Sequence, residues 1–237
     1  METIKQEMIH YWSQRVESFS AQRCREFQST KRELWLAEFS AYIPMQKGLR
    51  ILDIGTGTGF FATILAMAGH EVVGIDLTAQ MIGEAKRKAA HYQIPASFYV
   101  MDAEQPSFPP QSFDVLVSRN LTWTLPHLGA AYKAWHYLLK PGGLLLNFDA
   151  DYCHEKENRN LPENHAHKKI AADLIKQYEV MKEELRQPYT RPAWDTKLLQ
   201  QAGFSNIRVD TSVWKRIYAD VDEFYNPTPI FTIAAEA

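Results

Sequence analysis

The spacing of apolar residues changes abruptly at Leu49. Before that residue, apolar side chains recur every three or four positions, as at Ile4, Met8 and Trp12, and this spacing predicts helix. A proline and a glycine then end the helical pattern. We therefore expect residues 1–47 to form an N-terminal helical segment.

From residue 49 onward, short apolar runs alternate with longer helix-compatible stretches. The pattern predicts strands at 49–54, 71–76, 97–102, 113–118 and 144–148, with helices at 60–68, 79–92 and 128–139. Strands that alternate with helices form a parallel sheet, because each helix must cross back over the sheet. The strands are apolar nearly throughout, which is typical of strands covered on both faces.

The alternation breaks after Asp151. Residues 153–190 are polar and mostly helix-compatible, and this stretch is longer than an ordinary connection. We interpret it as an inserted helical cap. The regular pattern resumes with a helix at 194–202 and strands at 206–213 and 229–235.

The predicted fold is α/β: a doubly wound, mainly parallel seven-stranded sheet with helices on both faces. The core comprises residues 48–152 and 191–237. The N-terminal segment, 1–47, and the cap, 153–190, would form a lid that excludes water.

Composition and charge argue against nucleic-acid and membrane partners. The 237 residues are 46% hydrophobic with a formal net charge of −2, so the chain as a whole is not drawn to nucleic-acid phosphates. There is no apolar run long enough for a membrane helix and no apolar leader. Cys24 and Cys153 lack metal-binding spacing and are expected to be free thiols, so we expect a cytoplasmic protein.

A glycine-rich loop follows the first strand and opens a helix. Asp76 lies 21 residues after Gly55, where a carboxylate can accept hydrogen bonds from ribose hydroxyls. The spacing is G-x-G-x-G, and Phe60 replaces the last glycine of the dinucleotide pattern. Asp53 would repel a pyrophosphate but suit a cation. The loop therefore favours S-adenosylmethionine over NAD.

Five motifs resemble class I methyltransferases. They are Asp53-Ile54-Gly55-Thr56-Gly57-Thr58-Gly59, Asp76, Met101-Asp102-Ala103-Glu104, the segment 118–126 and the turn 139–143. The resemblance covers residues 49–150 densely, and it implies a Rossmann-like fold with S-adenosylmethionine as cofactor. It also implies that Asp53 and the glycine loop hold the amino-acid end, Asp76 the ribose, and Asp102 and Ala103 the adenine. The expected cofactor-binding residues are Asp53, Gly55, Thr56, Gly57, Gly59, Phe60, Asp76, Leu77, Met81, Asp102, Ala103, Glu104, Arg119 and Asn120.

Aromatic residues are the candidates for binding the methyl acceptor. Tyr11, Trp12 and Phe19 resemble a segment that closes over the cofactor in related enzymes, although an amphipathic helix would also pack such rings. Aromatic faces suit cations. Trp123 follows the fourth strand, at the sheet edge where ligands bind in open α/β folds, although a plain surface loop is the alternative.

The sequence assigns no definite catalytic residue. Asp151, Tyr152 and His154, after the fifth strand, are candidates for a general base, but a sulfonium is already activated and positioning alone can suffice. We expect no metal, because the histidines and carboxylates lack specific ligand spacing.

The sequence thus predicts methyl transfer to a small-molecule acceptor by in-line displacement, in a monomer or homodimer. The motifs that nucleic-acid methyltransferases place after the fourth strand are absent. Three alternatives stay open: a nicotinamide-dependent oxidoreductase, an aminopropyl transferase, and a regulatory protein that binds S-adenosylmethionine without catalysis. The cofactor that copurifies would separate the first two, and binding without methyl transfer would identify the third.

Overall fold

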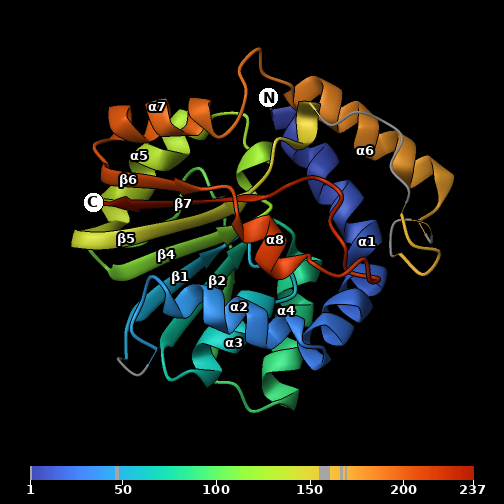
Figure 1. Cartoon of the computed structure of the whole chain (residues 1–237), viewed down its shortest axis with the longest axis horizontal. Helices are drawn as coiled ribbons and strands as arrows, with labels where there is room; N and C mark the ends of the chain where they lie inside the picture. Colours follow the sequence, from blue (N-terminus) through green and yellow to red (C-terminus); the bar gives the residue numbers. More distant parts are fainter. Residues whose placement is uncertain (1, 46–47, 155–160, 166–167, 169) are drawn as a thin grey trace.

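A computed structural model describes residues 2–45, 48–154, 161–165, 168 and 170–237. One seven-stranded sheet forms the centre, in the order β3-β2-β1-β4-β5-β7-β6 (Figure 1). The strands are β1 Arg50–Ile54, β2 Glu71–Asp76, β3 Ala96–Val100, β4 Phe113–Arg119, β5 Leu139–Asp149, β6 Ser205–Asp210 and β7 Phe231–Glu236.

Strands β1 to β5 pair in parallel, and β7 lies antiparallel between β5 and β6. The predicted mainly parallel, seven-stranded sheet is confirmed. The strand boundaries differ most from the prediction at β5, which begins at Leu139 and runs through the proline-glycine turn, and at β6, which ends at Asp210 because a short helix follows it.

Helices cover both faces of the sheet, as a doubly wound fold requires. In Figure 1, α2, α3 and α4 lie below the sheet and α5 and α7 above it. The helices are α1 Glu2–Gln28, α2 Lys31–Ser40, α3 Phe60–Met67, α4 Ala79–His91, α5 Leu128–Leu138, α6 Ala172–Leu185, α7 Ala193–Ala202 and α8 Val213–Ile217, with 3-10 turns η1 Thr122–Thr124 and η2 Tyr152–His154. None of these helices is long and apolar enough to cross a membrane.

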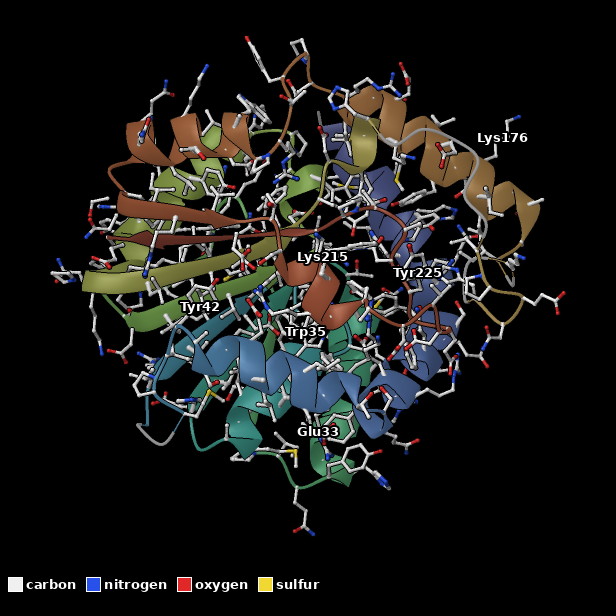
Figure 2. All side chains as sticks on the ribbon, in the orientation of Figure 1. Glu33, Trp35, Tyr42, Lys176, Lys215 and Tyr225 are labelled. Atoms are coloured by element: carbon white, nitrogen blue, oxygen red, sulfur yellow. The ribbon has the colours of Figure 1, made fainter. Side chains whose placement is uncertain are left out.

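The N-terminal helices are anchored to the sheet by aromatic packing. Trp35, labelled in Figure 2, and Phe39, both of α2, are fully buried. The Trp35 ring lies 4.9 Å from that of Phe61, and the Phe39 ring lies 5.5 Å from that of Phe148, both edge-on. Burying such rings is among the largest apolar contributions to a core, so α2 is fixed on α3 and β5.

Helices α1 and α6 run side by side at one end of the sheet (Figure 1). The segment between α8 and β7 reaches across to α1, where Arg25 pairs with Glu223 at 2.8 Å. Part of the predicted cap, residues 155–160, 166–167 and 169, lies outside the described residues. The division into lid, core and cap stays a prediction.

A buried ion network fixes the turn that follows β4. Arg191 lies 3.4 Å from Asp149 and 2.5 Å from Asp195, and both carboxylates are fully buried. Asp149 in turn accepts a hydrogen bond from the backbone N–H of Trp123 at 3.1 Å. Since buried charges are tolerated only when paired, this network sets the position of η1.

Replacing Arg191 should therefore destabilise the fold. Arg191→Met leaves Asp149 and Asp195 without their cation, and we expect the free energy of unfolding to fall by about 3–5 kcal/mol. Urea unfolding measures this. Arg208→Met, on the exposed strand β6, is the control and should change stability by about 0.5 kcal/mol or less. Equal losses in the two variants would contradict the assignment.

Candidate active site

A cavity of about 590 Å³ lies at the carboxyl edge of β1, β2 and β4. Its volume is typical of small-molecule sites. Most of the predicted site residues line it: Asp53, Gly55, Thr56, Gly57, Phe60, Asp76, Leu77, Met81, Asp102, Ala103, Arg119 and Asn120 for the cofactor, and Tyr11, Trp12, Phe19 and Trp123 for the acceptor. The topology thus brings together residues from both ends of the chain.

Two predicted cofactor residues do not line the cavity. Gly59, with φ +85°, packs beneath the loop, where an added Cβ would lie 3.2 Å from the Phe98 ring. Glu104 is buried; one carboxylate oxygen accepts a hydrogen bond from the backbone N–H of His127, and the other lies 2.5 Å from Nζ of Lys5. Glu104 therefore ties loops together behind the cavity wall.

The glycine loop adopts backbone that other residues avoid. Gly55 and Gly57 have φ of +68° and +53°, in the left-handed region. An added Cβ at Gly55 would lie 2.8 Å from Leu121. Bare backbone at this point keeps the loop tight and leaves its N–H groups accessible to a ligand.

Asp53 holds the glycine loop against the start of α3 through hydrogen bonds. Its Oδ2 accepts hydrogen bonds from Thr56 Oγ1 at 2.6 Å and from the backbone N–H of Ala62 at 3.0 Å. Burial raises the pKa of Asp53 to about 7, and the two hydrogen bonds oppose that rise. The group therefore titrates near neutral pH, and a bound cation would favour its ionised form.

Asp76 stands at the end of β2, beside the glycine loop. Its two carboxylate oxygens accept hydrogen bonds from the backbone N–H groups of Gly57 at 2.9 Å and Thr78 at 2.8 Å. A carboxylate can accept about four hydrogen bonds, so capacity is left for two hydroxyl groups. Burial raises the pKa of Asp76 above its ordinary value.

Lys5, at the start of α1, reaches the loop that follows β3. Its ammonium lies 2.6 Å from Asp102 and also pairs with Glu104. Sequence reasoning missed Lys5, because nothing local to residue 5 indicates a partner 97 positions away. This contact brings α1 over the part of the cavity predicted to hold adenine.

Six aromatic rings form a continuous aromatic wall of the cavity. Successive ring centroids lie 5.2–5.8 Å apart. In order along the wall, the residues are Phe19, Trp12, Tyr11, Tyr178, Trp123 and Tyr152. They come from α1, α6, η1 and η2, so the wall depends on the contact between Tyr11 of α1 and Tyr178 of α6. Ring faces of this kind suit a cation or a planar group.

Of the three candidate bases, the structure brings only Tyr152 to the cavity. Its hydroxyl donates to Asn120 Oδ1 at 3.0 Å and accepts from Asn226 Nδ2 at 2.7 Å. Burial raises the pKa of Tyr152 well above 10, so its hydroxyl stays protonated at neutral pH. Asp151 and His154 bond to each other at 2.7 Å and line a separate, small pocket.

Arginines on the cavity wall complete the site. Arg119 is buried against the Trp35 ring at 4.5 Å and pairs with Glu26 at 2.7 Å. Burial alone would raise the pKa of Glu26, but Arg119 and Arg23 lower it to about 2. Arg15 also lines the cavity, and sequence reasoning missed it. Its position four residues after Tyr11, on the same helical face, was the available signal.

The sequence matches a family model described as methyltransferase domain over residues 51–143. It is similar to phosphoethanolamine N-methyltransferase 3 of Arabidopsis thaliana, with 32% identity over 49% of this chain and 24% of the relative. It is also similar to 2-methyl-6-phytyl-1,4-hydroquinone methyltransferase of Synechocystis sp., with 30% identity over 60% of this chain and 44% of the relative. The chain thus matches less than half the length of these curated relatives.

Solved structures share the fold. A SAM-dependent methyltransferase from Aquifex aeolicus aligns with a TM-score of 0.59 and 17% identity, over 92% of this chain and 97% of the other. Haemonchus contortus phosphoethanolamine N-methyltransferase 2, in complex with S-adenosyl-L-methionine, aligns with a TM-score of 0.61 and 21% identity, over 85% and 51%. The cavity lies within this shared fold.

Titration of Asp53 should make stability depend on pH. Its ordinary pKa is 3.8, so between that value and about 7 the folded chain holds a proton that the unfolded chain releases. Stability of the wild type should therefore fall as pH rises through this window, by at most about 1.4 kcal/mol per pH unit.

Asp53→Asn removes this titration. Urea unfolding at several values between about pH 5 and pH 7 should show the wild type losing stability relative to the variant as pH increases. The difference between the two proteins isolates Asp53 from Asp76 and Asp149, whose pKa values burial also raises. Parallel pH profiles would contradict the assignment.

Proposed function

We propose that this chain, a member of the class I methyltransferases by its domain and its fold, transfers a methyl group from S-adenosylmethionine to a small-molecule acceptor by in-line displacement. One observation carries the proposal: Asp53 near the end of β1, Asp76 at the end of β2 and Asp102 just after β3 line one cavity beside a glycine loop. The similar plant, cyanobacterial and nematode proteins are named as methyltransferases of small molecules, and this supports the same class of acceptor.

The adenosine end fits the residues around β2 and β3. Asp76 retains hydrogen-bond capacity for both ribose hydroxyls. Asp102 and Ala103 would hold the adenine ring between their loop and the side chains of Leu77 and Met81, which also line the cavity. Lys5, paired with Asp102 at 2.6 Å, would orient that carboxylate.

The amino-acid end fits the glycine loop. Asp53 and the bare backbone of Gly55 would meet the ammonium group, and a cation there would favour the ionised form of Asp53. When bound, S-adenosylmethionine supplies a methyl group that its sulfonium already activates. The chain then has to hold the nucleophile in line and exclude water, which α1, α6 and the aromatic wall are placed to do.

Specific features count against the alternatives. Phe60 occupies the position of the third dinucleotide glycine, and Asp53 lies below the loop where a pyrophosphate would bind, which disfavours a nicotinamide enzyme. A regulatory protein that binds the cofactor without catalysis differs in one outcome: no labelled methyl group would reach any small molecule. The net charge of −2 supports an acceptor other than nucleic acid.

We further propose a cytoplasmic monomer or homodimer.

Calorimetric titration with S-adenosylhomocysteine and S-adenosylmethionine tests the cofactor. We expect wild-type protein to bind both, and Asp76→Ala to bind at least about tenfold more weakly because two charge-assisted hydrogen bonds are lost. Glu71→Ala is the matched control, since Glu71 is exposed at the opposite end of the same strand. Its affinity should stay unchanged. No binding by folded wild-type protein would refute the proposal.

A further inference from the structure

Arg15 is a buried cation that no ion pair joins to a carboxylate in the described part of the chain. Its relative exposure is 4%, it lines the cavity, and its Nε and Nη1 donate no hydrogen bond to any residue that the structure describes. Leaving these two guanidinium N–H groups buried without acceptors is costly, because burial removes the water that would otherwise accept from them. The cost is recovered when a bound ligand supplies the acceptor.

Four other cations on the cavity wall have carboxylate partners, whereas Lys168, which also lines the cavity, is exposed. Lys182 of α6 lies 3.1 Å from Glu179, and this pair is internal to the cap helix. Three further lining residues also pair with a carboxylate: Lys5 with Asp102, Arg23 with Glu26, and Arg119 with Glu26. Arg15 differs from these four, since no ion pair joins it to a described carboxylate.

Arg15 faces the acceptor side of the cavity. It shares a helical face with Tyr11, four residues earlier, and the Tyr11 ring packs 5.8 Å from Tyr178 of the cap helix α6. Burial raises the pKa of Tyr11, and both the charge of Arg15 and its hydrogen bond to the phenol act against that rise. Phe19, by contrast, packs on Gly57 of the glycine loop.

The two sides of the cavity therefore differ in charge. Asp53, Asp76 and Asp102 line the side predicted to hold the cofactor, whereas Arg15 lies on α1 beside Tyr11 of the aromatic wall. Tyr225, labelled in Figure 2, and its neighbours along the chain also line the cavity. A ligand that fills this space needs an apolar or planar body and an anionic group.

We propose that the methyl acceptor carries a carboxylate or phosphate group, which Arg15 binds while the aromatic wall holds the rest of the molecule. Arginine suits this role because its planar fork stays charged and matches both anions. The inference rests on the proposed function and deepens it by naming the class of acceptor.

The test uses protein saturated with S-adenosylhomocysteine, so that the cofactor side is filled. Phenyl phosphate, benzoate and the neutral benzyl alcohol are titrated separately, and fluorescence of Trp12 and Trp123, which line the cavity, reports binding. We expect at least one of the two anions to bind the wild type tenfold or more tightly than benzyl alcohol. Arg15→Met should abolish that preference, and Arg15→Lys should restore part of it.

Stability and cofactor affinity provide the controls. Arg15→Met should keep or raise the thermal midpoint of the ligand-free protein, because it removes a buried unpaired charge; a residue that merely supports the fold would lower it. Its affinity for S-adenosylhomocysteine should change by less than fivefold.

Several outcomes would overturn the role of Arg15. These are no preference for either anion in the wild type, a preference that survives in Arg15→Met, a lowered thermal midpoint, or a loss of fivefold or more in S-adenosylhomocysteine affinity, which would assign Arg15 to the cofactor. Failure of the wild type to bind S-adenosylhomocysteine would instead refute the proposed function, so the two failures are distinguishable.

Discussion

The parallel pairing of β1 with both β2 and β4 is the constraint on which the site depends. Ile54, at the end of β1, is in register with Ile75 on one side and Ser118 on the other. The three strands therefore end at the same edge of the sheet, and the loops after β1 and β4 lead to opposite faces. The glycine loop, Asp76 and the turn η1 meet there because the topology allows no other arrangement.

Two buried arginines illustrate how paired and unpaired charges differ in role. Arg191 lies between Asp149 and Asp195, and this closed network fixes η1 and with it Trp123. Arg15 is also buried but has no described counter-ion. Burying an unpaired charge lowers the stability of the ligand-free protein. A core stabilised by networks such as that of Arg191 can tolerate this loss.

The core and the cofactor half could be predicted from sequence because their signals are local. A short apolar run, the glycine spacing and an acidic residue at the next strand end identify β1, the loop and Asp76. The contacts that build the other half join distant positions, such as Lys5 with Asp102 and Tyr11 with Tyr178. Asp151 shows the same limit: its position after β5 suggested the cavity, but the turn η2 directs it to a separate pocket.

The residues that match the methyltransferase domain and the other cavity-lining residues lie in different parts of the sequence. The methyltransferase domain match ends at residue 143 and begins at 51, so it contains the glycine loop, Asp76 and Asp102. Tyr11, Arg15 and Tyr178 lie outside it. The similar proteins are named for acceptors as different as phosphoethanolamine and a phytyl hydroquinone. Under the proposed function, specificity for the acceptor would reside in the cavity-lining segments outside the matched domain, namely α1, α6 and the segment that carries Tyr225.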